Sequence, residues 1–267
     1  GDGESVSSEQ VNNALMQLRK ISLHPYLFMA EYKRNADLYR TSGKVEALDR
    51  LLTKLLKFGH KVLIFSQFTS MLSILEDYLQ WRGIENVRLD GQVAHEKRKE
   101  RIDRFQADPK LQVFLLSARA GGLGLNLQAA DTVVLFDLDW NPQNDKQAIA
   151  RVHRVGQQKE VRVVRLVTDT SVERHMEKRC QEKLEMEQKI MGAGMFRRQA
   201  TAEQRRDALR AVLGLGDAAQ AASDGAAAKA DDLTRPEELN ALLARSDEER
   251  AAFQALDDEA LRPRKGA

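Results

Sequence analysis

Two arginines three residues apart are the first residues in this chain whose type and spacing could do chemistry. Arg151 and Arg154 lie in the stretch Gln147–Gln157, QAIARVHRVGQ, which carries Gly156 near its end. Residues at i and i+3 share one helix face, and a glycine shortly afterwards is a common place for a helix to end. The stretch therefore predicts two guanidinium groups that point the same way from the last turn of one helix. Planar guanidinium forks suit phosphate oxygens, although a solvated basic helix end would have the same composition.

A glycine-rich loop stands upstream of the two arginines. It follows an apolar run and reads SARAGGLGLNL over residues 117–127. Gly121, Gly122 and Gly124 let the backbone come close to a ligand and point its N–H groups at that ligand. The loop is therefore a second candidate for contact with phosphate or with a nucleic-acid backbone.

A dinucleotide-cofactor enzyme is one alternative use of the glycine loop. Gly122 and Gly124 follow a predicted strand, and Asp137 ends the next one, as at the start of a dinucleotide-binding unit. However, Leu127 stands where that fingerprint needs its third glycine. The segment 125–131 is also too short for the crossover helix of such a unit. A nicotinamide- or flavin-dependent enzyme therefore remains only a remote alternative.

The chain contains no phosphate loop of the NTPase type. The tripeptide Ser-Gly-Lys at residues 42–44 looks like the end of one, but Leu38 replaces its first glycine and Val45 replaces its Ser or Thr. Without such a loop, we expect Asp137 to be a cap or loop residue rather than a metal ligand.

Taken together, the arginine stretch, the glycine loop and the tetrapeptide Asp-Trp-Asn-Pro at 139–142 resemble the last motifs of superfamily-two helicase motors. The similarity is greatest to the C-terminal motor lobe of Swi/Snf-type, Brahma-class chromatin-remodelling ATPases, and it runs from about Leu15 to Phe196. It implies a nuclear DNA translocase that uses ATP with magnesium. Its partners would be double-stranded DNA and nucleosomes, a first RecA-like lobe and subunits of a remodelling complex, with no membrane. The first lobe would carry the phosphate loop, the water-activating residue and the acid that holds the metal, so this chain alone would be inactive.

The resemblance also implies three groups of site residues. The catalytic group consists of Arg151 and Arg154, which would act as arginine fingers on the transferred phosphoryl group. The residues implied to bind nucleotide are Gly122, Gly124, Asn126 and Gln147. The residues implied to contact DNA are Ser117, Arg119 and Trp140, although a tryptophan is more often a core residue. The resemblance implies no metal ligand in this lobe.

Two positions depart from the family pattern. The family usually has threonine where Ala118 stands, and an acidic residue where Ala150 precedes Arg151. The first change removes a hydroxyl that could bind phosphate, and the second removes a carboxylate that would orient the arginine. These changes leave open an alternative function, a non-catalytic module that binds nucleic acid or nucleosomes and whose motor activity has decayed.

The elements that must position these residues alternate between strand and helix. An apolar stripe of helical spacing follows Ser42, and Gly59 closes it. Five apolar strands are then expected at residues 62–65, 87–89, 113–116, 132–136 and 161–167. This alternation predicts an α/β fold with a mainly parallel sheet flanked by helices, and the resemblance makes it RecA-like, with a helical C-terminal extension.

The chain divides into four expected segments. These are a helical lead-in (1–41), the RecA-like lobe (42–170), a helical brace (171–196) and a helical tail (197–267). The tail resembles, more weakly, the ATP-coupling segment that follows the motor in Brahma-class remodellers. Within it, residues 214–232 are alanine-rich with almost no large apolar side chains, so we expect a flexible linker there.

Composition excludes several other classes of protein. Lysine and arginine total 42 against 40 aspartates and glutamates, so any DNA contact must be a local patch rather than bulk charge. A single cysteine, Cys180, cannot form an internal disulfide and fits a reducing compartment. The five histidines are scattered without zinc-site spacing. No apolar run reaches the ~18 residues that span a bilayer, and no secretory signal opens the sequence, so we expect an intracellular soluble protein.

Overall fold

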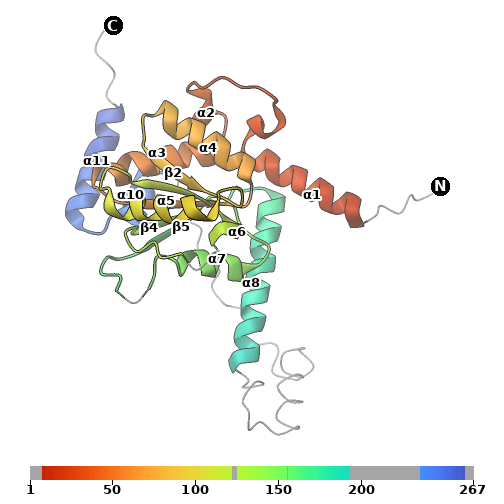
Figure 1. The fold of residues 1–267 in the computed structure, drawn as a ribbon. Coiled ribbons are helices and arrows are strands. Elements are labelled where there is room, and N and C mark those ends of the chain that lie inside the picture. Colours follow the sequence, from red (N-terminus) through yellow and green to blue (C-terminus); the bar gives the residue numbers. More distant parts are fainter. Residues whose placement is uncertain (1–7, 122–124, 155, 193–234, 262–267) are drawn as a thin grey trace, which may run out of the picture.

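Five parallel strands form one sheet in the described part of the chain (Figure 1). The computed structural model describes residues 8–121, 125–154, 156–192 and 235–261, so the predicted linker at 214–232 lies outside it. The strands are β1 (Val62–Ser66), β2 (Asn86–Leu89), β3 (Val113–Ser117), β4 (Thr132–Leu135) and β5 (Arg162–Arg165). Their order is β2-β3-β1-β4-β5, and every neighbouring pair is parallel. The predicted fold class is confirmed.

The central strand β1 shows why the three inner strands, β3, β1 and β4, are mostly apolar, whereas the edge strands β2 and β5 also carry polar residues. Its side chains alternate between two hydrophobic clusters, with Val62 and Ile64 in one and Leu63 and Phe65 in the other. All five residues of the strand are buried because helices cover both faces of the sheet. Burial of each large apolar side chain contributes about 1.5–3 kcal/mol, so packing on both faces of the sheet stabilises β1.

Helices α3 (Gly43–Lys57) and α4 (Thr69–Trp81) cover one face of the sheet. The predicted apolar stripe of α3 is buried against β1 as expected. Ser42 begins the helix, because its Oγ accepts the N–H of Val45 at 3.3 Å. Gly59 ends it with a φ of +76°, a backbone conformation that favours glycine.

The opposite face carries the elements of the candidate site. Helices α5 (His95–Ala107), α6 (Ala118–Gly121) and α7 (Pro142–Ile149) pack there against the second hydrophobic cluster.

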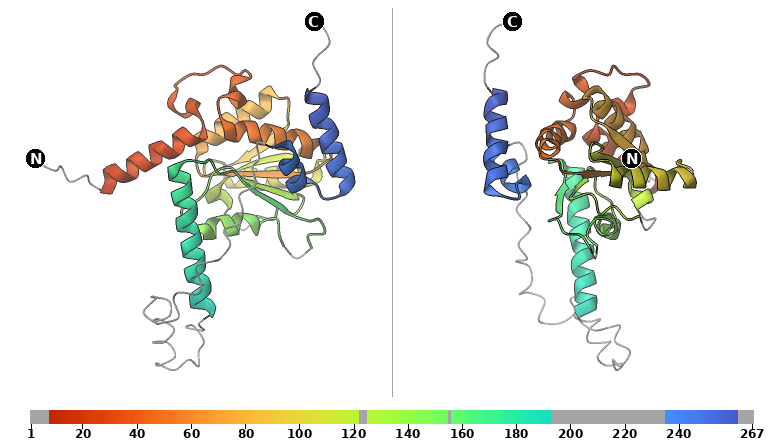
Figure 2. Two further views of the ribbon diagram at one scale, coloured as in Figure 1. Left: turned by 180° about the vertical axis from the view of Figure 1, so that it is seen from behind. Right: turned by 60° about the vertical axis from the view of Figure 1, so that its left-hand side comes forward.

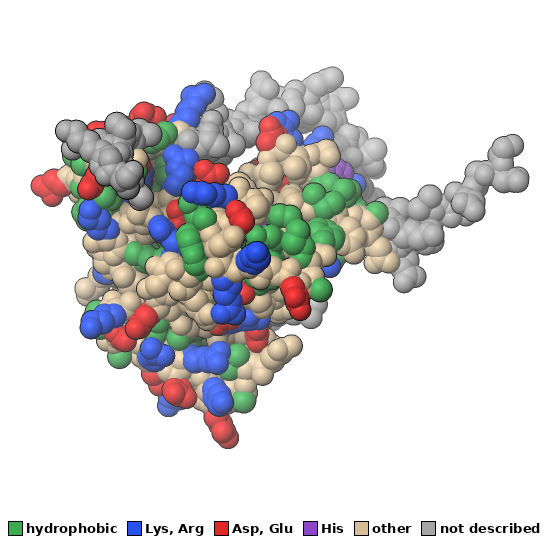
Figure 3. Space-filling model, turned by 90° about the horizontal axis from the view of Figure 1, so that it is seen from above, with side chains coloured by type: hydrophobic (Ala, Val, Ile, Leu, Met, Phe, Trp, Pro, Cys, Tyr) green, Lys and Arg blue, Asp and Glu red, His purple; other side chains and the backbone are tan. Residues whose placement is uncertain are grey.

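Figure 3 shows the other side of the molecule, above α3 and α4 in the view of Figure 1, where Lys and Arg side chains are interspersed with Asp and Glu. No single-sign patch covers that surface, as the balanced net charge suggests.

Four buried charges tie the N-terminal and brace helices to the end of β4. Helix α1 (Ser8–Leu23) leads through a 3-10 turn (Pro25–Phe28) and α2 (Asp37–Arg40) into the lobe, and α8 (Ser171–Gly192) follows β5. Lys44 Nζ on α3 lies 2.7 Å from Glu173 Oε1 on α8 and 3.2 Å from the carbonyl oxygen of Phe136. The charged members of this cluster are Arg19, Lys44, Asp137 and Glu173, all less than a tenth exposed.

Asp137 is the loop residue that the sequence predicts, and it is buried. Its carboxylate accepts the backbone N–H of Gln67 at 3.0 Å, and Arg19 Nη2 lies 3.8 Å from it. Burial raises the pKa of Asp137 to about 6, against the opposing effect of that hydrogen bond and of the nearby Lys44 and Arg19. The carboxylate of Asp137 therefore interacts with buried groups of the protein and is not exposed to solvent.

The C-terminal helices pack on the same face as α3. Helices α10 (Pro236–Leu243) and α11 (Asp247–Leu261) lie side by side against the lobe in both views of Figure 2. Leu239, Leu243 and Phe253 are fully buried in the hydrophobic cluster of that face. Phe253 also meets Phe58 edge-on, with ring centroids 5.2 Å apart. This helical pair is therefore part of the lobe's packed core.

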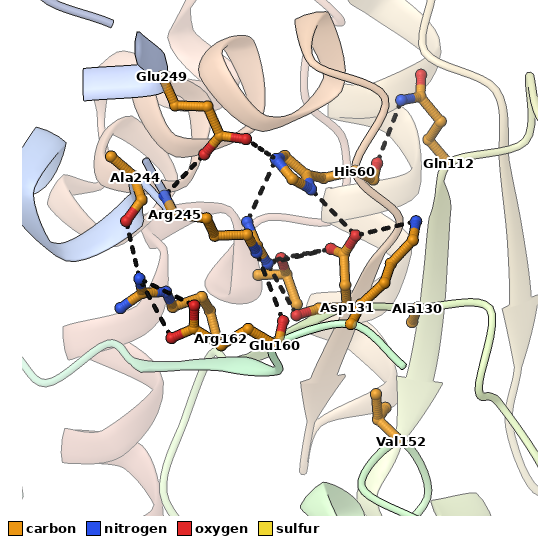
Figure 4. Close-up of polar contacts among 12 residues, drawn as sticks. His60, Gln112, Ala130, Asp131, Val152, Glu160, Arg162, Ala244, Arg245 and Glu249 are labelled. Carbon is orange, nitrogen blue, oxygen red and sulfur yellow. Dashed lines mark hydrogen bonds and ion pairs between the residues drawn. The ribbon is translucent and has the colours of Figure 1, made fainter. Parts of the chain in front are cut away.

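Arg245, in the turn between α10 and α11, anchors the pair to the sheet (Figure 4). Its Nη2 donates to the carbonyl oxygen of Asp131 at 2.9 Å, to Asp131 Oδ1 at 3.2 Å and to Thr132 Oγ1 at 2.9 Å. His60 Nδ1 lies 3.0 Å from the other carboxylate oxygen, and its Nε2 lies 3.3 Å from Glu249 on α11. Burial acts to raise the pKa of Asp131, but the hydrogen bond and charge of His60 and the charge of Arg245 lower it overall.

Removal of the Arg245 side chain should therefore destabilise the lobe. We expect Arg245→Ala to lower the free energy of unfolding by about 2–3 kcal/mol, because the buried Asp131 and Thr132 lose their hydrogen bonds to the guanidinium, while His60 and Lys159 stay beside the carboxylate. Urea unfolding of the 267-residue chain measures this change. The matched control is Arg250→Ala, an exposed arginine on the same helical pair, which should change stability by less than about 0.5 kcal/mol. Equal effects of the two substitutions would show that Arg245 is not an anchor.

Candidate functional site

The two candidate arginines lie after helix α7. Asn141 begins the helix, since its Oδ1 accepts the N–H of Gln143 at 3.2 Å, and the last helical residue is Ile149. Arg151 follows in a turn, and Arg154 lies in irregular backbone just beyond it. The prediction that both arginines extend from the last turn of one helix is therefore wrong. We call residues 150–154 the arginine turn.

Tertiary contacts explain why the helix ends early. The carbonyl oxygen of Arg151 accepts the backbone N–H of Leu127, 3.2 Å away, so this carbonyl is drawn toward the glycine-loop segment. Val152 is fully buried in the hydrophobic cluster beneath it. A regular helix through these residues would lose both contacts, and tertiary packing outweighs local propensity here.

The arginine turn carries an incompletely satisfied cation. Arg151 is half-buried, and its Nε is a buried donor without a hydrogen-bond partner among the described residues. Burial and the charge of Arg154 lower the pKa of Arg151. Arg154 Nε donates to the carbonyl oxygen of Ala150 at 3.2 Å. An unmade hydrogen bond of this kind costs about 1–3 kcal/mol, so an anionic oxygen at Arg151 would be stabilised.

Ala150 bears on the orientation of Arg151. Its side chain is a methyl group where the family pattern has an acid, so position 150 offers no carboxylate to Arg151. This matches the unpaired Nε of that arginine. A phosphate oxygen of a ligand would supply Arg151 Nε with the hydrogen-bond acceptor that Ala150 lacks.

The candidate nucleotide residues lie partly within the described chain. Gly122 and Gly124 fall outside it. Asn126 is exposed, and it directly precedes Leu127, the residue that binds the arginine turn. Gln147 is exposed on α7, ahead of the arginines. The structure thus places Asn126 next to the arginine turn, while the nucleotide contacts of these residues remain predictions.

The candidate DNA residues have distinct surroundings. Ser117 is buried at the end of β3, where its Oγ accepts the N–H of Ala120 at 3.2 Å and so begins α6. The side chain of Arg119 lies outside the described part of the structure. Trp140 is half-buried and meets the ring of His175 on α8 edge-on, with centroids 6.4 Å apart. Trp140 is therefore neither a fully buried core residue nor fully exposed, and its DNA contact remains a prediction.

The sequence does not reveal the contacts of Gln157 beside the arginine turn. Its side chain donates to the backbone carbonyl oxygens of Gln128 and Ala130. A polar residue in a loop gives no sequence signal of such contacts, because its partners are far away along the chain. The same holds for Lys44 on α3, whose ion pair with Glu173 belongs to the buried charge cluster.

Metal and membrane sites can be assessed only in the described ranges. There, no group of three or more His, Cys, Asp or Glu side chains could hold a metal ion. None of the helices seen there has the length and apolar character needed to cross a membrane.

Comparison with known proteins places this arrangement in a family. The helicase conserved C-terminal domain family matches residues 43–156. The chain is 43% identical over 263 residues to the probable ATP-dependent DNA helicase CHR23 of Arabidopsis thaliana, covering 97% of this chain and 24% of that protein. It is also 43% identical to the SWI/SNF chromatin-remodeling complex subunit snf22 of Schizosaccharomyces pombe, covering 97% of this chain and 16% of that protein. The chain thus spans a quarter or less of the length of these relatives.

A solved structure agrees with the sequence relatives. The crystal structure of the C-terminal part of the Fun30 ATPase domain superposes with a TM-score of 0.60 at 31% identity. The match covers 67% of this chain and 78% of that structure. The parallel sheet and the helicase match, which covers its strands β1 to β4, point to the same assignment. The chain belongs to the Swi/Snf class of helicase-related proteins and forms their C-terminal helicase lobe.

Proposed function

We propose that this chain is the second motor lobe of a nuclear, ATP-dependent DNA translocase that remodels nucleosomes. The observation that carries the proposal is the arginine turn, which holds two neighbouring guanidinium groups and a buried Nε donor without an acceptor among the described residues. A hydrogen bond from Leu127, which follows the candidate nucleotide residue Asn126, to the carbonyl oxygen of Arg151 supports the proposal. The names of the relatives, a DNA helicase and a chromatin-remodeling subunit, favour the same activity.

In the proposed mechanism, ATP lies between this lobe and a first lobe that supplies the phosphate loop and holds magnesium. Arg151 and Arg154 donate hydrogen bonds to the oxygens of the transferred phosphoryl group and stabilise the charge that spreads over them. The nucleotide contacts on this lobe come from Gly122, Gly124, Asn126 and Gln147.

Translocation would follow from closure of the two lobes around ATP. Arg119 and Trp140 would contact one DNA strand, and their movement with the lobe would advance the protein along double-stranded DNA. The buried Ser117, predicted from the sequence to contact DNA, would instead hold the start of α6, the helix that carries Arg119. An indole face suits stacking or groove contact, and Trp140 is exposed enough for part of its ring to reach a ligand. Subunits of a remodelling complex would be further partners.

A second candidate function is a binding module without motor activity. Ala118 and Ala150 favour it, since each replaces a polar group that the family pattern has near the nucleotide. Such a module would bind DNA or nucleosomes through the same lobe, but would not respond to ATP. Turnover of a two-lobe protein separates the two functions.

The 267-residue chain alone should hydrolyse no ATP, because the phosphate loop and the water-activating residue are absent from it. Steady-state phosphate release with and without double-stranded DNA measures this. DNA-stimulated turnover that co-purifies with the chain would contradict the assignment of those roles to a first lobe. Weak nucleotide binding by the chain is compatible with it.

The arginines can be tested after the chain is joined to the phosphate-loop lobe of a matched relative. Arg151→Ala and Arg154→Ala should each lower kcat by about three to five orders of magnitude if each acts as a full arginine finger. Losses of one or two orders would mean that the two arginines share the task. Arg→Lys should restore little, since lysine lacks the bidentate fork. Steady-state ATPase assays provide the measurement.

Two controls make this test specific. Lys146→Ala removes an exposed cation of α7 whose ion pair with Glu187 lies at the surface, so it should leave kcat nearly unchanged. Trp140→Ala should keep basal hydrolysis but weaken DNA stimulation. An arginine variant that kept full basal turnover and lost DNA affinity would instead place the arginine turn on the DNA side.

A further inference from the structure

Gln157 makes a set of contacts that none of the proposed roles uses. Its Nε2 donates to the carbonyl oxygens of Gln128 and Ala130, each 3.0 Å away, and lies 3.5 Å from that of Val152. Its Oε1 accepts the backbone N–H of Lys159 at 3.0 Å. Both ends of the side-chain amide are therefore occupied, and all of its partners are backbone groups.

The turn before Gln157 directs its side chain toward this segment. Gly156 has a φ of +100°, in the region that favours glycine, and the N–H of Gln157 donates to the carbonyl oxygen of Arg154 at 3.0 Å. A Cβ on Gly156 would meet only Gln128 Nε2, at an ordinary contact distance of 3.6 Å. The glycine is therefore needed for its backbone conformation rather than for space.

The arginine turn is consequently fixed at two points to one neighbouring segment. At its start, the carbonyl oxygen of Arg151 accepts the N–H of Leu127. Beyond its end, Gln157 binds the carbonyl groups of Gln128 and Ala130. Residues 127–130 follow directly on the candidate nucleotide residue Asn126, so a shift of either fixed point would move the arginines relative to the nucleotide site.

We propose that Gln157 is a positioning residue for ATP hydrolysis. It holds Arg151 and Arg154 in a fixed position relative to the backbone of residues 127–130. This inference rests on the proposed function. The essential property is the pair of amide donors, since two backbone carbonyl oxygens converge on one nitrogen. Guanidinium groups displaced by about 1 Å from the phosphoryl oxygens can lose about a hundredfold in rate.

Three substitutions of Gln157 separate the effects of its hydrogen-bond donors, its hydrogen-bond acceptor and its shape. Gln157→Glu keeps length and an acceptor for the N–H of Lys159 but sets a carboxylate against two carbonyl oxygens. Gln157→Lys keeps donors, and Gln157→Met keeps only the approximate shape. Gln158→Glu is the matched control, because it makes the same charge change at an exposed neighbour.

The experiment measures kcat, KM for ATP and DNA affinity in the two-lobe protein, each normalised to folded protein. Gln157→Glu and Gln157→Met should lower kcat by about 10- to 100-fold while KM and DNA affinity stay within about twofold. Gln157→Lys should recover most of the loss, and Gln158→Glu should have no effect. Because Gln157 acts through both arginines, Gln157→Met added to the Arg151→Ala, Arg154→Ala double variant should lower kcat no further.

Hydrogen exchange on the 267-residue chain provides an independent readout. Gln157→Met should accelerate exchange of the Leu127 amide, whose partner is the Arg151 carbonyl, while the amides of β1 and β3 keep their protection. Loss of protection throughout the sheet, with kcat per folded molecule unchanged, would show a purely structural role and overturn the inference. Unchanged kcat in Gln157→Met, or a further loss when it is added to the double arginine variant, would also overturn it.

The two proposals fail in different ways. If Arg154→Ala and Arg151→Ala both retain full turnover, the proposed function of the arginine turn is wrong. If those variants lose turnover while Gln157→Met and Gln157→Glu do not, only the positioning role of Gln157 is wrong.

Discussion

One short backbone segment, residues 127–132, makes the contacts on which the arginine turn, the sheet and the C-terminal helices all depend. Its first N–H binds the carbonyl of Arg151, and two of its carbonyl groups bind Gln157. At its far end, Asp131 and Thr132 bind Arg245 as β4 begins. Buried polar groups must find partners, so this segment, the arginine turn and the helical pair restrict one another's positions.

The buried charge cluster imposes a second constraint, on the helices that enter and leave the lobe. Lys44 and Glu173 join α3 to α8, and Arg19 joins α1 to the loop after β4, donating to the carbonyl oxygen of Leu138 at 2.8 Å. Buried ion pairs add little net stability compared with well-packed apolar groups, but loss of one partner is costly. The main effect of the cluster is therefore on the orientation of α1 and α8, rather than on the free energy of unfolding of the lobe. Helix α8 also carries His175, whose ring contacts Trp140.

The sequence predicted the parts of the fold that depend on local pattern. The five strands lie within about two residues of their expected bounds. The inner three are buried on both faces and are therefore short apolar runs in the sequence. The end of α7 was predicted wrongly, since the contacts of Arg151 and Val152 that end it involve other parts of the chain. Arg245 and Asp131 lie 114 residues apart, and no periodicity reveals that such a pair will meet. Sequence resemblance found the arginines, but not the segment that holds them.

The role of the arginine turn is tested by a structure of the chain joined to a phosphate-loop lobe, bound to DNA and to ADP with aluminium fluoride, which resembles the transferred phosphoryl group. If the arginines act on that group, the guanidinium nitrogens of Arg151 and Arg154 will lie at hydrogen-bond distance, about 2.7–3.1 Å, from the fluoride ligands. The Leu127 N–H will still bind the carbonyl oxygen of Arg151. A closed complex in which both arginines lie on the DNA, with other cations on the fluoride ligands, would contradict the proposed role of the arginines.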